Sequence, residues 1–184
     1  MILQLFKKTK QLDFERTYRA PLATVWQAWT DPDMLRQWWG PEKTFIPECR
    51  ADLRVGGELY LVMEAGEAMG KYAGTRWPMA GTFTRIEPTA QLTYDARSWT
   101  EGEEEGSTIH HTNDVTFTES DGTTTVTLRI AITHIGAKAK MAAFGMKFGY
   151  KAQLDKLDKL LTEPPRGVRR LFDLTTQLAA GLVC

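Results

Sequence analysis

Hydrophobic and polar positions alternate along much of the first 135 residues. Residues 12–19 place Leu12, Phe14 and Tyr18 on one face and charged or polar side chains on the other, which predicts a half-buried strand. Short connections, among them the hairpin turn Asp121-Gly122, predict that most of the strands form an antiparallel meander. Further extended segments are expected at 45–52, 58–64, 79–87, 91–99 and 108–118, and after the hairpin turn through Ile132.

Two short helices are predicted between the first two strands. Pro21 opens the first helix, where the missing amide hydrogen of proline costs nothing. Asp31 and Pro32 open the second, with the aspartate as N-cap and the proline in the first helical position. Gly40-Pro41 ends it. The loop 65–78, rich in Gly and Met, is expected to act as a lid.

After Gly136 the apolar positions recur at steps of three and four residues. This period predicts one long amphipathic helix over 137–162, about 37 Å in length. We expect the helix to lie across the concave side of the meander and to leave a hollow beneath it. The stripe that should face the strands consists of Ala143, Met146, Tyr150, Leu154, Leu157 and Leu161.

A second apolar patch lies on the other side of the same helix. Because a surface helix would not need Met141, Phe144 and Phe148 there, the first half of the helix is expected to be covered on two sides. The segment 166–184 has its own helical spacing of apolar residues. We therefore divide the chain into a domain of residues 1–165 and a tail helix of residues 166–184. The tail is expected to pack on this patch, within its own chain or in a homodimer.

Composition narrows the classes of partner. Lys plus Arg and Asp plus Glu each number 23, so the net charge is zero and the basic surface that nucleic acids require is not expected. No apolar run approaches the roughly 18 residues of a membrane span. The segment 1–8 is too short and too soon charged for a secretory signal, so we expect a cytoplasmic protein. Cys49 and Cys184 can form one disulfide, but two free thiols are favoured because nothing indicates export.

The sequence contains no recognised catalytic or metal-binding motif. It has no phosphate loop, no dinucleotide fingerprint, no HExxH and no GxSxG, and its cysteines lack metal-ligand spacing. Neither a cofactor nor a metal is therefore expected. His111 and Asn113 fall on the apolar face of their strand, whereas His110 points to the other face. His111 could orient a ligand, act as an acid or base, or be a hydrogen-bonded structural residue. A metal pair of His111 with His134 is the least favoured alternative.

Aromatic residues are the main functional indication. The chain has six Trp, eight Phe and five Tyr, more than an ordinary core of this size needs. We expect some of them to line an apolar ligand cavity, with His111 or Arg97 fixing the orientation of the ligand and Trp39 gating the opening. The candidate cavity residues are Trp39, Met63, Trp77, Phe83, Tyr94, Arg97, Trp99, His111, Phe117, Met141, Phe144 and Phe148.

Five ordered motifs carry a resemblance to a known family. Together they span roughly residues 12–162, and they resemble the C-terminal domain of the activator of Hsp90 ATPase, a family of the START/Bet v 1-like superfamily. Where the family closes with Gly-Trp, this chain has Gly149-Tyr150. The other motifs are Ala20-Pro21 through Asp31-Pro32 followed by Leu35 through Pro41, Asp52-Leu53-Arg54-Val55-Gly56-Gly57, Gly81 through Pro88, and Asp121 through Leu128.

The resemblance implies an α+β helix-grip fold, in which a curved antiparallel sheet wraps around a long C-terminal helix. It leaves three functions open, because a shared fold does not transfer an activity. The favoured one is the binding of a small hydrophobic or aromatic molecule without catalysis. The second is activation of an Hsp90-type ATPase, although there is no sign of the additional N-terminal domain that such co-chaperones carry. The third is an enzyme similar to polyketide cyclases.

Overall fold

The computed structural model describes residues 10–162. The segment 166–184 and Cys184 lie outside the described residues, so the predictions of a tail helix and of a disulfide stay predictions. The described elements follow one another as β1 (Lys10–Tyr18), α1 (Leu22–Thr30), α2 (Pro32–Trp38), β2 (Thr44–Ala51), β3 (Glu58–Ala65), η1 (Glu67–Tyr72), β4 (Arg76–Glu87), β5 (Gln91–Ser98), α3 (Glu104–Ser107), β6 (Ile109–Ser120), β7 (Thr123–Ile135), η2 (Ala137–Ala139) and α4 (Lys140–Thr162).

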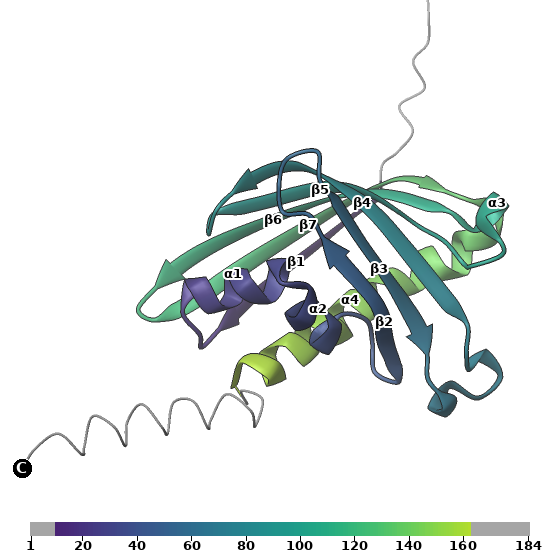
Figure 1. Ribbon diagram of the computed structural model, residues 1–184, viewed down its shortest axis with the longest axis horizontal. Helices are drawn as coiled ribbons and strands as arrows, with labels where there is room; N and C mark the ends of the chain where they lie inside the picture. Colours follow the sequence, from purple (N-terminus) through teal and green to yellow (C-terminus); the bar gives the residue numbers. More distant parts are fainter. Residues whose placement is uncertain (1–9, 163–184) are drawn as a thin grey trace, which may run out of the picture.

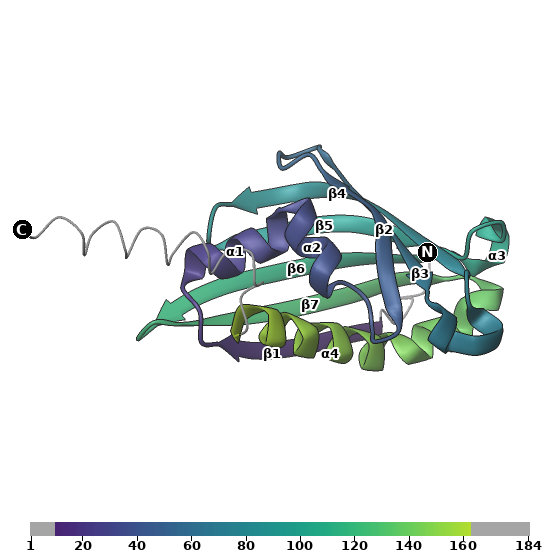
Figure 2. The ribbon, with the colours of Figure 1, turned by 60° about the horizontal axis from the view of Figure 1, so that its bottom comes forward.

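The seven strands form one antiparallel sheet in the order β1-β7-β6-β5-β4-β3-β2. The sheet arches over α4, and α1 and α2 lie on the same concave side (Figures 1 and 2). Strands β2 to β7 follow one another as the predicted meander, and β1 closes the far side by pairing with β7. The predicted helix-grip architecture is therefore confirmed.

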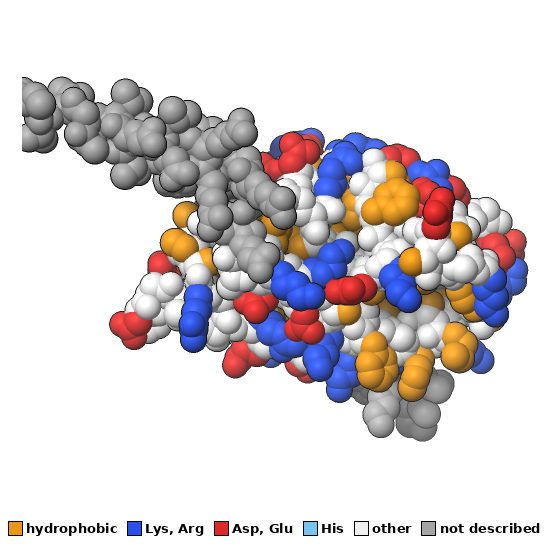
Figure 3. Space-filling model, turned by 90° about the horizontal axis from the view of Figure 1, so that it is seen from below, with side chains coloured by type: hydrophobic (Ala, Val, Ile, Leu, Met, Phe, Trp, Pro, Cys, Tyr) orange, Lys and Arg blue, Asp and Glu red, His pale blue; other side chains and the backbone are white. Residues whose placement is uncertain are grey.

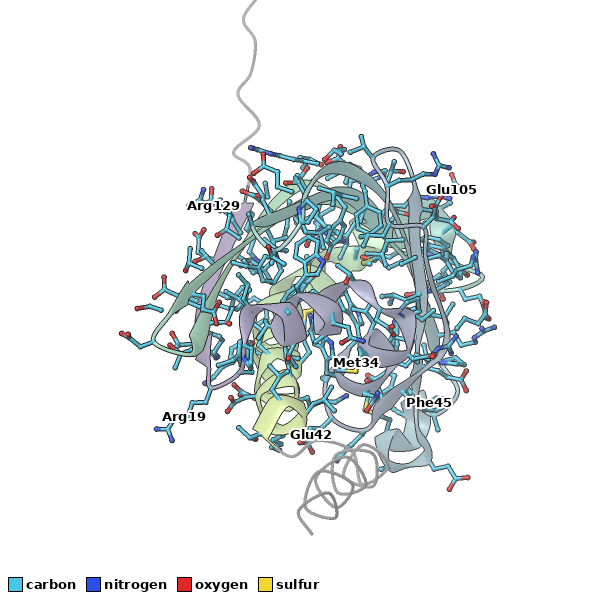
Figure 4. The ribbon with its side chains drawn as sticks, turned by 60° about the vertical axis from the view of Figure 1, so that its left-hand side comes forward. Arg19, Met34, Glu42, Phe45, Glu105 and Arg129 are labelled. Atoms are coloured by element: carbon cyan, nitrogen blue, oxygen red, sulfur yellow. The ribbon has the colours of Figure 1, made fainter. Side chains whose placement is uncertain are left out.

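Buried and outward-facing side chains alternate along the strands, and the buried ones pack between the sheet and the helices. In β6, Ile109, Val115 and Phe117 are buried while their neighbours reach the outer surface. Side chains project into the space between the sheet and the helices in Figure 4, whereas the labelled Arg129 of β7 lies outside. Register shifts between Phe45 and Glu48, between Phe83 and Arg85, and between His110 and His111 interrupt the ladders. Such bulges increase local twist and bend the strands, which helps the sheet to curve.

One strand begins earlier than the sequence predicts. Strand β4 starts at Arg76, so Trp77 belongs to the sheet, where it pairs with Met63 of β3. The predicted loop 65–78 is correspondingly shorter and contains the 3-10 helix η1. Cross-strand pairing of a large aromatic residue overrides the turn character that neighbouring glycine and proline give this segment.

The two short helices close one end of the concave side. The carboxylate of Asp31 caps α2 by accepting hydrogen bonds from the amides of Asp33 at 2.8 Å and Met34 at 3.1 Å. The buried indole of Trp38 donates to the carbonyl of Ala28 at 2.8 Å, which satisfies an orphan carbonyl in the last turn of α1. Trp29 packs on Trp38 with ring centroids 4.9 Å apart. Both rings are buried, so this aromatic pair forms part of the core at that end of the molecule.

The predicted stripe of α4 faces the sheet. Ala143, Leu154 and Leu157 are buried, and Met146, Tyr150 and Leu161 pack against the core. That the tail or a second copy of the chain covers the other side of the helix stays a prediction, because the tail lies outside the described residues. Figure 3 views the molecule from the α4 side, with hydrophobic side chains in orange. The exposed fractions of the three residues concerned are 79% for Met141, 66% for Phe144 and 67% for Phe148.

The motif at residues 52–57 makes a turn that only glycine permits. A Cβ atom on Gly57 would lie 2.0 Å from the carbonyl oxygen of Asp52. The turn is tied to β4, because the amide of Gly56 donates to the carbonyl of Phe83 at 2.8 Å and the amide of Phe83 donates to Gly57 at 3.0 Å. Tight backbone pairing explains the glycine without any ligand.

Candidate ligand cavity

A cavity of about 330 Å³ lies between the sheet and the first half of α4. Its wall combines the inner faces of β3 to β6, the segment after α2 and one side of the helix. No lining side chain carries a formal charge. The lining residues are Trp39, Pro41, Leu61, Met63, Trp77, Met79, Ser98, Trp99, Thr100, Ser107, Ile109, His111, Ala142, Gly145, Met146, Gly149, Tyr150 and Gln153.

Small residues on α4 leave this end of the groove open. Ala142, Gly145 and Gly149 succeed one another at steps of three and four, so they share the side of the helix that borders the cavity. A Cβ atom added to Gly145 or Gly149 would meet nothing within 4 Å. Further along the helix, Leu154 and Leu157 fill the equivalent space with buried side chains. A hollow therefore lies beside the first half of the helix, where the side chains that border it are small.

Polar side chains form a short hydrogen-bonded chain beside the cavity. The amide nitrogen Nδ2 of Asn113 lies 2.8 Å from Nδ1 of His111, and both residues are buried on the inner face of β6. The hydroxyl of Tyr150 on α4 donates to Oδ1 of Asn113 at 3.4 Å. Because Nδ2 of an asparagine can only donate, Nδ1 of His111 accepts, and a neutral ring then carries its proton on Nε2.

Burial keeps His111 neutral. Desolvation lowers its pKa from the ordinary 6.5 to about 4, because burial penalises the protonated, charged ring. The same cause raises the pKa of the Tyr150 hydroxyl, and burial also raises that of Tyr94. At neutral pH the polar part of the wall is therefore uncharged.

Gln153 is the site residue that sequence reasoning missed. Its Oε1 accepts a hydrogen bond from the amide of Gly40 at 3.1 Å, which fixes the side chain beside the cavity. Its Nε2 is buried and has no hydrogen-bond partner within residues 10–162. The signal was present in the sequence, since Gln153 follows Tyr150 by three residues and Met146 by seven, within the apolar stripe.

The structure brings five of the candidate residues together. Trp39, Met63, Trp77, Trp99 and His111 all border the cavity, from the segment after α2 to β6. Trp39 is 6% exposed and is held between Trp38, whose ring centroid lies 5.3 Å away, and the cavity. The indole nitrogen of Trp99 donates to a carboxylate oxygen of Glu104 at 3.0 Å, which links the end of β5 to α3. Whether these residues bind a ligand stays a prediction.

Three other candidates are packed in the core instead. Phe83 and Tyr94 contact each other with ring centroids 6.0 Å apart, and Phe117 packs on Trp26 at 5.2 Å. All three lie on the inner face of the sheet, as expected, but none borders the cavity. Trp26 and Trp29 of α1 occupy the space that Phe117 faces.

The remaining candidates lie outside the cavity and are corrections to their predicted placement. Arg97 is on the outer face of β5, where its guanidinium stacks 4.7 Å above the ring of Trp99. Met141, Phe144 and Phe148 point away from the sheet, because their positions on α4 are out of phase with the buried stripe. The alternative pair of His111 with His134 is not formed either, since His134 pairs across the strands with His110.

Three further findings concern metal binding, membrane insertion and the reactivity of Cys49. Within residues 10–162, no three His, Cys, Asp or Glu side chains gather closely enough to hold a metal ion. No helix in the same range is both long and apolar enough to cross a bilayer. Cys49 is buried on β2, and burial raises the pKa of its thiol to about 11, so the thiol is protonated at neutral pH.

The curved antiparallel sheet, the long final helix and the cavity between them define a protein of the helix-grip class. A family model described as activator of Hsp90 ATPase homolog 1-like protein matches residues 19–162. The chain therefore belongs to the family of activator of Hsp90 ATPase homolog 1-like proteins. No curated protein matches it.

Solved structures share the fold. Protein Ms6760 from Mycobacterium smegmatis is similar with a TM-score of 0.67 and 23% identity, over 86% of this chain and 98% of that one. Protein NE0264 from Nitrosomonas europaea has a TM-score of 0.64 and 24% identity, over 83% and 94%. The AHSA1 protein from Silicibacter pomeroyi has a TM-score of 0.60 and 23% identity, over 83% and 98%. At these identities the likeness concerns the fold alone.

Proposed function

We propose that this protein binds a small, largely apolar molecule in the cavity between the sheet and α4. The supporting observation is the cavity itself, whose wall of indole, aliphatic and thioether groups is interrupted by only a few polar groups. Its volume of about 330 Å³ is at the lower end of the range typical of small-molecule sites. A compound with one or two rings fits this space.

Apolar burial sets the expected affinity. A two-ring compound that buries roughly 250 Å² of apolar surface gains about 6 kcal/mol at 25 cal/mol per Å². Loss of translational and rotational freedom on binding opposes this gain. The net result is a micromolar or weaker complex unless polar contacts add to it, so binding should be measured at ligand concentrations up to millimolar.

Native mass spectrometry of the protein purified from its own host is the direct test. A retained small molecule is the expected result, and it should be absent from Gly145→Leu. That substitution places a side chain in the open space at Gly145, and the helix should tolerate it because leucine has a higher helix propensity than glycine.

Lys147→Leu is the matched control, because it adds a leucine at an exposed position of the same helix without filling the cavity. The proposal requires Lys147→Leu to retain the molecule. If the native protein carries nothing and two-ring aromatic compounds at millimolar concentration do not shift its tryptophan fluorescence, the cavity is not a ligand site.

Activation of an Hsp90-type ATPase is the second candidate function, favoured by the family match over residues 19–162. It predicts that the purified chain binds such an ATPase and raises its turnover. Gly145→Leu separates the two candidates, because filling the cavity should abolish ligand binding and leave ATPase stimulation unchanged. Failure to bind or stimulate the ATPase in a titration to saturating protein rejects this second function.

A further inference from the structure

Two buried side chains beside the cavity have hydrogen-bond capacity that residues 10–162 do not use. Nδ1 of His111 is engaged with Asn113, and the ring makes no second hydrogen bond in the described part of the chain. The Nε2 amide of Gln153 is buried without a partner. Each of these free groups is a donor, since the neutral imidazole carries its proton on Nε2 and an amide nitrogen can only donate.

Three other polar groups of the wall are already engaged in hydrogen bonds. The hydroxyl of Tyr150 donates to Asn113, the hydroxyl of Ser107 accepts from the amide of Thr100 at 3.0 Å, and the indole of Trp99 donates to Glu104. Because buried polar groups are nearly always hydrogen-bonded, unused donors beside a cavity call for an acceptor. The two donors come from opposite layers, His111 from the sheet and Gln153 from α4.

Charge complementarity limits the form of that acceptor. No Lys or Arg side chain borders the cavity, and His111 is neutral. A carboxylate placed there would lose its hydration without gaining a counter-ion, which is costly in an apolar site. A ketone, aldehyde, ester or amide oxygen accepts hydrogen bonds at a much lower cost of desolvation.

We propose that the cavity selects neutral, largely apolar compounds that carry a carbonyl oxygen, and that this oxygen accepts hydrogen bonds from His111 and Gln153. The apolar body of the compound then lies against the tryptophan and methionine side chains of β3 to β5. This inference rests on the proposed ligand-binding function and adds a chemical class to it.

The test compares three matched probes, 2-acetonaphthone, 2-ethylnaphthalene and 2-naphthoate, by tryptophan fluorescence and calorimetry at pH 8. His111→Leu should weaken the binding of 2-acetonaphthone by about tenfold, the amount typical of one lost hydrogen bond, and change that of 2-ethylnaphthalene by less than about twofold. Comparing the effect of one substitution on two ligands cancels the different hydration of the ligands. His110→Leu, on the outer face next to it, should change neither.

A vibrational readout tests the contact itself. The carbonyl band of bound 2-acetonaphthone should lie at lower frequency than in hexane, and His111→Leu should reduce that shift. Gln153→Leu removes the other donor, which lies on the helix instead of the sheet, and should cause the same selective loss of affinity for the ketone. It keeps the proposal testable if His111→Leu does not fold.

The possible outcomes distinguish failure of the carbonyl selection from failure of the proposed ligand binding. If both variants lose equal affinity for the ketone and the hydrocarbon, or if 2-naphthoate binds as tightly as the ketone, the proposed selection for a carbonyl oxygen is wrong. The proposed ligand-binding function is unaffected by either result. Absence of binding by all three probes at millimolar concentration overturns both.

Discussion

Lowering the pH should destabilise this protein, and the contribution of His111 to that loss of stability can be calculated. In the folded state its pKa is about 4, and in the unfolded chain the ordinary value of 6.5 applies. The unfolded state therefore binds the proton more readily at every pH between these values. Stability is fully present above about pH 6.5 and falls as the pH decreases towards 4.

The difference between the two pKa values corresponds to about 3 kcal/mol in total, of which about 2 kcal/mol is lost between pH 7.5 and 5.0. The side chain is 3% exposed, so solvent screening does not reduce this figure greatly. The cost arises because protonation would place a charge on a ring that is buried on the inner face of β6. The neighbouring His110 adds a smaller electrostatic repulsion.

Urea denaturation of the wild type and of His111→Gln at pH 7.5, 6.5, 5.5 and 5.0 measures this contribution. All other titrating groups are shared, so the difference in slope between the two proteins isolates His111. We expect the wild type to lose about 2 kcal/mol more than the variant between pH 7.5 and 5.0. His110→Gln should keep the wild-type slope. Parallel slopes for the wild type and His111→Gln, or a His111 resonance that titrates near 6.5, would refute the reasoning.

Three further predictions concern the structure. Gly57→Ala should lower the free energy of unfolding by about 1–3 kcal/mol in urea, because its Cβ would meet the carbonyl of Asp52 at 2.0 Å, and an unchanged midpoint contradicts this. Trp38→Phe should cost about 1–3 kcal/mol in the same assay by leaving the carbonyl of Ala28 without its donor. Deleting 166–184 should lower the melting temperature or dissociate a dimer if that segment covers the apolar patch on α4. Unchanged melting temperature and mass reject that packing.

Much of the fold could be predicted from local patterns in the sequence. The alternation in residues 12–19 and 124–132 predicted two strands, which are β1 and β7 in the structure. The Asp31-Pro32 signal located the start of α2 correctly. These inferences succeed because side-chain direction repeats every two residues in a strand and every 3.6 in a helix. The face of α4 that carries Leu154 and Leu157 was predictable for the same reason.

The boundary of β4 was less predictable. Glycine and proline around Trp77 indicated a loop, yet the pairing of Trp77 with Met63 extends the strand to Arg76. Cross-strand partners are distant in sequence, so the gain from pairing them cannot be derived from the local composition. The hydrogen bond that anchors Gln153 was equally hidden, since its partner is the amide of Gly40 on another element.

The sequence by itself determined which positions are inward on each element. It also predicted the succession of strands along the chain, the two short helices and the long final helix. Only the tertiary structure decided where empty space remains. Phe117 and Trp39 both face inward, but Phe117 is buried against α1 while Trp39 borders the cavity. A cavity is the volume left after all side chains have packed, so it depends on side chains from elements that are distant in the sequence. The local pattern of apolar residues therefore cannot predict it.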